Sequence, residues 1–294
     1  MLSAKLFLRP VLFGLLTACG GIAPAQTDPA AAQPNGPQPG APTNPTCALP
    51  ASPTVSTLAT GTAIRGSLAT NAANVFWAEG VDATLYRAAK AGGGAIAMQG
   101  AMGSVVAADD AAVYVVTGAG NASDFGIVRV PLDGGAVTTI VANSTAITAI
   151  AIDDARVYWG ASGSIGDCFS DTCPAPTPSL TSAPKTGGPS TTLGAFTVTH
   201  LHVDGDLLYF ANQVASDLPG APNTSIGTMP KTGGAPAKLV SRPGAALSDI
   251  ALDATNVYWA ESDLSDVLPP VIMTAPKAGG AATPVATIAT HDPG

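Results

Sequence analysis

Short apolar runs separated by turn residues fill the chain from about residue 54 to residue 290. The last four of them show the pattern most clearly: "LSDIALD" (247–253), "NVYWAES" (256–262), "VIMTAPK" (271–277) and "TPVATIAT" (283–290). Each run is rich in β-branched residues or alternates apolar with polar residues, as short strands do. The pattern therefore predicts antiparallel strands and an all-β fold.

Two motifs repeat along this region, five times each and in a fixed order. The first has Asp or Asn four positions before a branched apolar residue, which one or two aromatic residues follow; the second is a turn that ends in Gly-Gly. The first occurs as "NAANVFWAE" (71–79), "DDAAVYVVT" (109–117), "DDARVYWGA" (153–161), "DGDLLYFAN" (204–212) and "DATNVYWAE" (253–261). The second occurs as "AKAGG" (89–93), "PLDGG" (131–135), "PKTGG" (184–188), "PKTGG" (230–234) and "PKAGG" (276–280). A spacing of 38 to 53 residues is typical of a repeat architecture.

Each repeat accounts for one four-stranded sheet. The Asp or Asn suits a tight turn between the first two strands, because its side chain can accept a backbone N–H two residues on. Gly-Gly suits the turn between the last two strands, because glycine tolerates positive φ. A lone sheet leaves both faces open, and radial repetition buries them against neighbouring sheets. We therefore predict a β-propeller whose blades pack in a ring.

Five repeats favour five blades, with six as the alternative. The alternative arises because "TVSTLAT" (54–60) is similar to the final "PVATIAT" (284–290) and could be an additional fourth strand. The first strand of each repeat also has one bulky and one small position, as sheets that pack face to face require. The bulky series is Leu68, Val106, Ile150, Leu201 and Ile250, and the small series is Ala69, Ala107, Ala151, His202 and Ala251.

The aromatic and glycine motifs resemble those of two repeat families. They are similar to the YWTD-type propellers of the low-density lipoprotein receptor class, and to "VYW…PK-x-GG" repeats in bacterial lipoproteins, notably myxobacterial ones. The resemblance covers residues 54–290 and implies the propeller fold without implying an activity. Thr-Asp never follows Tyr-Trp here, since the chain reads "YWGA" and "YWAE". The receptor family's six blades and binding mode therefore do not carry over.

The N-terminus reads as an export signal over residues 1–18. Lys5 and Arg9 precede an apolar run that is too short to span a bilayer of about 30 Å. The run ends in "LTAC" (16–19), which is similar to the bacterial lipobox; the resemblance implies lipidation of Cys19 by a diacylglycerol and an N-acyl chain such as palmitate. Gly20 follows the cysteine, and in lipoproteins of this kind that implies the outer membrane. An ordinary cleaved signal is the alternative.

Residues 19–53 are rich in Pro, Ala and Gly and carry little charge, which predicts a disordered tether. The propeller domain then covers residues 54–294. The formal net charge is −8, and loss of Lys5 and Arg9 with the signal would make it more negative. Such a body repels nucleic acid, so the expected partners are the membrane, through the lipid, and an envelope or extracellular protein or glycan. No cofactor is expected.

Three cysteines follow Cys19. Cys168 and Cys173 lie five positions apart in a proline-rich loop, and an oxidising compartment favours a disulfide between them. Half of a zinc site is the alternative, but no histidine is near. Cys47 is left without a predicted partner.

The connections between second and third strands vary most, and variable loops on one rigid face are where binding usually lies. They carry the carboxylates that we single out as a candidate binding face. These are Glu79, Asp82, Asp124, Asp167, Asp171, Asp217, Glu261, Asp263 and Asp266. The set could attract a cationic partner or Ca²⁺, but the spacing of a calcium loop is missing, so a solvated acidic rim is favoured and no metal is expected.

Histidine is scarce, and "HLH" places His200 and His202 on one face of a strand. His200 stands at the position that Asp249 holds in the next repeat, which predicts a polar His200–Asp249 pair between blades. No nucleophile elbow or phosphate loop accompanies it. We therefore favour a lipid-anchored, extracytoplasmic binding or scaffold module in the cell envelope. The alternative is an extracytoplasmic hydrolase or lyase with a site on the variable-loop face.

Overall fold

The computed structural model divides the chain into two units, Met1–Ser56 and Thr57–Gly294. It describes residues 57–60, 64–80, 83–103, 106–118, 125–162, 177–215, 222–263 and 270–287. The predicted signal, Cys19, Cys47, the tether, Cys168 and Cys173 lie outside the described residues.

The second unit consists of five sheets, each with four antiparallel strands. The first blade is β1 (Ile64–Thr70), β2 (Asn74–Glu79), β3 (Thr84–Ala89) and β4 (Ala95–Met102); the second is β5 (Val106–Ala108), β6 (Ala112–Thr117), β7 (Phe125–Pro131) and β8 (Thr138–Ser144); the third is β9 (Ile147–Ile152), β10 (Arg156–Ala161), β11 (Ser179–Pro184) and β12 (Thr191–Gly194); the fourth is β13 (His200–Asp204), β14 (Leu207–Ala215), β15 (Pro222–Pro230) and β16 (Ala237–Pro243); the fifth is β17 (Ala245–Leu252), β18 (Asn256–Asp263), β19 (Val271–Pro276) and β20 (Thr283–Thr287). In every blade the strands pair in chain order, so four consecutive strands complete one sheet.

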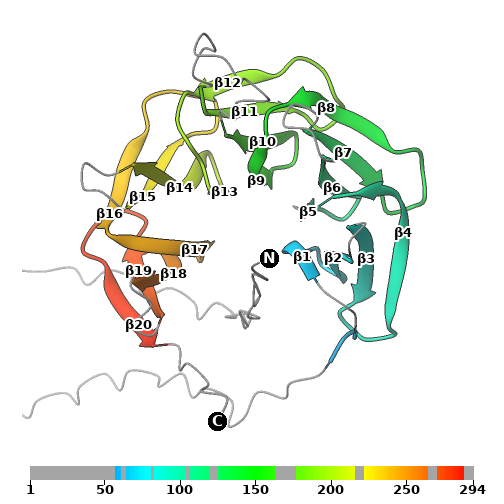
Figure 1. Ribbon diagram of the computed structural model, residues 1–294, viewed down its shortest axis with the longest axis horizontal. Coiled ribbons are helices and arrows are strands. Elements are labelled where there is room, and N and C mark those ends of the chain that lie inside the picture. Colours follow the sequence, from blue (N-terminus) through cyan, green and yellow to red (C-terminus); the bar gives the residue numbers. More distant parts are fainter. Residues whose placement is uncertain are drawn as a thin grey trace, which may run out of the picture. The chain divides into compact units, whose positions relative to one another are not determined.

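The five sheets are arranged as propeller blades around a common centre, with the first strand of each blade innermost (Figure 1). The predicted all-β propeller of four-stranded blades is thus confirmed, with five blades. The predicted extra strand at 54–60 is not formed in its described part, because residues 57–60 belong to no strand. Residues 54–56 lie outside the described residues.

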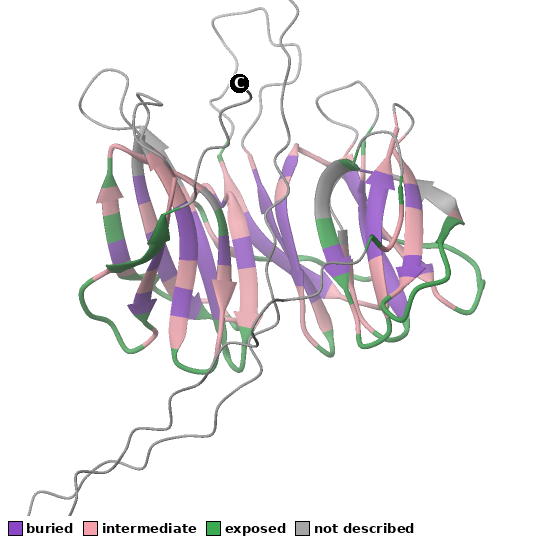
Figure 2. Cartoon of the chain, turned by 90° about the horizontal axis from the view of Figure 1, so that it is seen from below, coloured by how far each residue is buried: buried purple, intermediate pink, exposed green. Residues whose placement is uncertain are grey.

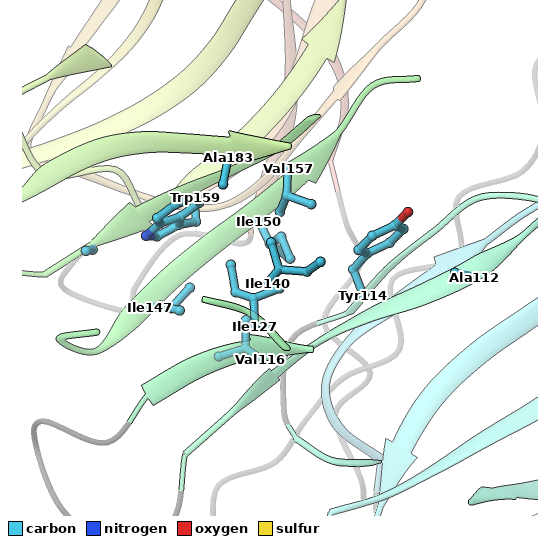
Figure 3. Packing of buried hydrophobic residues seen from close by; sticks show 11 residues of the cluster. Ala112, Tyr114, Val116, Ile127, Ile140, Ile147, Ile150, Val157, Trp159 and Ala183 are labelled. Atoms are coloured by element: carbon cyan, nitrogen blue, oxygen red, sulfur yellow. The ribbon is translucent and has the colours of Figure 1, made fainter. Parts of the chain in front are cut away.

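The aromatic motif works by sending neighbouring side chains to opposite neighbours. Tyr158 and Trp159 are adjacent on β10, so they lie on opposite faces of the third blade. Trp159 packs against the second blade with Ile150 and Val157, whereas Tyr158 packs against the fourth (Figure 3). Both are almost fully buried. One motif therefore seals two interfaces, which explains why it recurs.

Four apolar clusters join successive blades. They contain Ala69, Phe76, Leu85 and Val113 between the first and second blades; Tyr114, Ile127, Ile150 and Trp159 between the second and third; Tyr158, Leu180, Leu201 and Phe210 between the third and fourth; and Tyr209, Ile226, Ile250 and Trp259 between the fourth and fifth. Among the described residues no such cluster joins the fifth blade to the first, and the arc is open there (Figure 1). The ring predicted from the repeats is thus present at four interfaces.

The leading Asp closes the turn between the first two strands of a blade. In the third blade, Asp153 Oδ1 accepts the backbone N–H groups of Ala155 and Arg156, both at 2.8 Å, and Oδ2 accepts the hydroxyl of Tyr158 at 2.9 Å. Burial raises the pKa of Asp153, but these bonds outweigh it and hold the pKa below the usual range. The aromatic residue of the motif is thus also part of the turn.

A lysine from the next blade completes the same corner. Lys185 Nζ lies 2.7 Å from Asp109 and 5.3 Å from the ring centre of Tyr114, and Lys231 Nζ lies 3.4 Å from Asp153. Lys277 pairs with Asp204 in the same way and lies over the ring of Tyr209. We call this contact, between the lysine that follows Pro in the Gly-Gly motif and the leading Asp of the preceding blade, the interblade clasp.

Candidate functional site

The two kinds of connection lie on opposite faces of the propeller. The leading-Asp and Gly-Gly turns form one edge, and exposed turns gather along the bottom of Figure 2. The second strand of each blade ends on the other edge, where the connections to the third strand differ in length. These connections are 80–83, 118–124, 162–178, 216–221 and 264–270. The scaffold therefore holds five unlike segments on one face.

Most of the carboxylates assigned to this face from the sequence cannot be placed. Asp82, Asp124, Asp167, Asp171, Asp217 and Asp266 lie outside the described residues, and Asp263 is described only as the last residue of β18. Glu79 and Glu261 are described, each at or near the end of a second strand. The binding face as a set thus stays a prediction.

Glu261 ties two blades together. Its carboxylate accepts the indole N–H of Trp259 at 2.8 Å and the Nε–H of Arg242 at 2.8 Å, and it also pairs with Nη2 of Arg242. Arg242 belongs to β16 of the fourth blade, and hydrogen bonding to Glu261 raises its pKa, with burial opposing. Since its oxygens are engaged in this way, Glu261 acts as a structural anchor of the face. The sequence showed no periodic signal for Arg242.

Glu79 occupies the corresponding place in the first blade and accepts the indole N–H of Trp77 at 3.3 Å. Trp77 stacks on Tyr86 with ring centres 6.0 Å apart. Beside them lies a hollow of about 500 Å³, lined by Thr57–Thr60, Glu79, Tyr86, Gly94 and Ala95. The chain that enters the first blade thus passes over the outer part of its free face.

The histidine pair lies between the fourth and fifth blades. His200 Nδ1 lies 3.2 Å from the hydroxyl of Thr199, whereas the His202 ring hydrogen-bonds the backbone of Ile250 and interacts with the charge of Asp249. Asp249 Oδ1 accepts the N–H of Ile250 at 2.8 Å. The described hydrogen bonds include none between His200 and Asp249, so the polar group centres on His202. The signal for His202 was its place in a series of alanines.

A second hollow, of about 490 Å³, opens beside His202. It is lined by His202, Val203, Asp204, Ala251, Leu252, Asp253, Ala254 and Lys277. Two carboxylates and an ammonium group at its wall are already engaged in the corner contacts described above. Within the described ranges, no three His, Cys, Asp or Glu side chains are grouped so that they could hold a metal ion.

Replacement of His202 by alanine should make stability less sensitive to mild acid. Burial lowers the pKa of His202, the charge of Asp249 opposes this, and His200 adds to the lowering. The unfolded chain therefore takes up a proton near pH 6.5, before the folded one does, and stability falls as the pH drops below that value. Alanine is the residue of the other four blades at this position.

Urea unfolding at pH 7.5 and pH 5.5 measures the effect. The natural chain should lose more free energy of unfolding between the two pH values than His202→Ala, since all other titrating groups are common to both. Equal losses would show that His202 keeps its ordinary proton affinity in the folded state.

The part of the chain that the structure describes contains no helix that is long and apolar enough to span a bilayer. Neither a known family model nor a curated protein matches the chain. Among solved structures, it is similar to a protein of Agrobacterium tumefaciens described as TolB, with a TM-score of 0.53 at 12% identity over 72% of this chain and 76% of that one. An apocarotenoid oxygenase mutant from Synechocystis gives a TM-score of 0.45 at 9% identity, over 68% and 54% of the two chains. At such low identity the first likeness shows the propeller fold alone.

Proposed function

We propose that this chain is a binding or scaffold module that presents its variable-loop face to a partner. The observation that carries the proposal is the contrast between the two faces. On one face the five corners repeat the same turns, and three of them carry the same interblade clasp. On the other face, a rigid set of strand ends holds five connections that share neither length nor sequence. Such an arrangement suits recognition by loops on a fixed scaffold.

The partner that fits is an envelope protein or glycan, and the location is extracytoplasmic. The apolar N-terminal run and "LTAC" support export and attachment of lipid to Cys19. More than one acyl chain gives stable anchoring, at about 0.8 kcal/mol per buried methylene. An outer-membrane position follows from Gly20 by resemblance only. Mass spectrometry of the mature N-terminus tests the anchor, since an unmodified Cys19 would exclude it.

Shortening the longest connection should abolish partner binding. Residues 163–178 are replaced by a tight turn that resembles 80–83, and both chains are crosslinked in intact envelopes. A crosslinked product of defined mass should form with the natural chain and disappear with the shortened one, because the partner contacts that segment. The matched control is Asp133→Ala, an exposed change on the opposite face, which should leave the product unchanged. An identical product from the shortened chain would place the partner elsewhere.

A further inference from the structure

The interblade clasp follows a rule that links each blade to the one before it. A lysine occurs in the Gly-Gly motif of the third, fourth and fifth blades, and the blade preceding each has a leading Asp. The second blade breaks both halves of the rule together. It has Leu132 in place of the lysine, the blade before it has Asn71 in place of the Asp, and Leu132 packs against the apolar cluster between these blades. Cation and carboxylate are thus present together or absent together.

One half-clasp is left at each end of the arc. The first blade carries Lys90 at the lysine position, and the fifth blade carries Asp253 at the Asp position. Lys90 is exposed, and among the described residues neither has an ion-pair partner. Asp253 has the turn of an intact corner, with bonds from the backbone of Thr255 and Asn256 and from the hydroxyl of Tyr258 at 2.7 Å. It lacks the lysine alone.

The apolar residues of the two end blades show the same incompleteness. On the first blade, Ala69 faces the second blade, so alternation places Leu68 on the opposite flank, where it is 56% exposed. Its counterparts Ile150, Leu201 and Ile250 all face the preceding blade and are buried.

On the fifth blade, Ile272 pairs with Ala260 and is only half-buried. The residues at the same register on the other four blades are completely buried against the following blade. They are Leu85, Ile127, Leu180 and Ile226. Tyr258 of the fifth blade is likewise half-buried, whereas Tyr114 and Tyr158 are almost fully covered. Each end blade therefore presents the surface that an inner blade buries.

We infer that the two flanks are each other's partners: the first blade docks on the fifth blade of the same chain and closes the ring, with Lys90 against Asp253. The first-blade flank supplies the cation and the bulky residue that the fifth-blade corner and face lack, and the reverse also holds. A second copy of the chain would supply the same surfaces. However, linkage within one chain provides an effective concentration of about millimolar, which separate copies do not reach.

This contact, which we call the seam, differs from the closure that strand exchange would provide. Every blade is complete in four consecutive strands, so no strand of the first blade contributes to the sheet of the fifth. Face packing and one clasp alone hold the seam. It is therefore the interface at which the ring opens, and the open arc is one of its two states.

Distance measurement between spin labels tests the seam. Labels are placed as genetically encoded residues at Ala91 and Ala254, the exposed neighbours of Lys90 and Asp253, so that the clasp and the natural cysteines are kept. A second chain carries labels at Asp110 and Thr186, the equivalent exposed neighbours in the intact Asp109–Lys185 clasp. Double electron–electron resonance should give the same distance distribution for both pairs.

Two controls separate the alternatives. Lys90→Glu should lengthen the distance between positions 91 and 254, because two carboxylates would face each other, whereas Lys238→Glu, an exposed change of the same charge, should not. Tenfold dilution with unlabelled protein should leave the short distance unchanged. A longer distance than in the reference chain would show that the ring stays open, and a short distance lost on dilution would show that a second copy occupies the seam. Either result overturns the inference.

Discussion

Replacement of Trp259 by alanine is expected to lower the free energy of unfolding by about 3–5 kcal/mol, the cost of removing a large buried aromatic side chain. Trp259 is completely buried between the fourth and fifth blades, where it packs with Tyr209, Ile226 and Ile250. Its loss leaves a cavity at an interface and removes the indole bond to Glu261. Urea unfolding, followed by circular dichroism, measures the change.

The matched control is Ile96→Ala, which removes an apolar side chain that is 56% exposed on β4. Such a surface change should stay within about 0.5 kcal/mol. If the two variants unfolded at the same urea concentration, Trp259 would not hold the interface and the cluster assignment would be wrong.

The second large effect is expected at a corner. Asp153→Ala should cost about 2–3 kcal/mol at neutral pH, because one carboxylate accepts two backbone N–H groups, the Tyr158 hydroxyl and the Lys231 ammonium group. The pKa of Asp153 is lowered in the folded state, so its contribution is complete above about pH 4 and is lost as the pH falls further. The deficit of the variant should therefore shrink in strong acid.

Asp154→Ala serves as the control, since it removes the same charge from the next, exposed position. Thermal unfolding at pH 7 and at pH 3 checks both variants. A deficit of Asp153→Ala that is as large at pH 3 as at pH 7 would mean that the corner is held by something other than the ionised carboxylate.

The regular part of the fold could be predicted from the sequence because it depends on local chemistry repeated five times. Gly187 and Gly188, for example, have φ values of 81° and 128°, as a Gly-Gly turn requires. The aromatic pair of the third blade was expected to be interblade core, and Tyr158 and Trp159 are. Alternation along a strand is enough to assign such positions to a face.

The candidate site could not be predicted to the same depth, for a physical reason. The sequence places His200 and His202 on one face of β13, yet which of them reaches Asp249 depends on the stagger between the inner strands of two blades. Packing across the interface sets that stagger, and no local pattern encodes it. The clasp was missed for a related reason. Lys231 and Asp153 are far apart in the chain, and their link is visible only when each repeat is compared with the one before it.

The contiguity of each blade has a consequence for how the molecule is made. Because a sheet needs only four successive strands, its backbone hydrogen bonds connect residues that are close in the chain, which favours rapid local folding. A nascent chain can thus complete its first sheet before the second has left the ribosome or a translocation channel. Loss or duplication of one repeat would likewise remove or add a whole sheet and leave the hydrogen bonds of the others intact, so the number of blades is free to change during evolution.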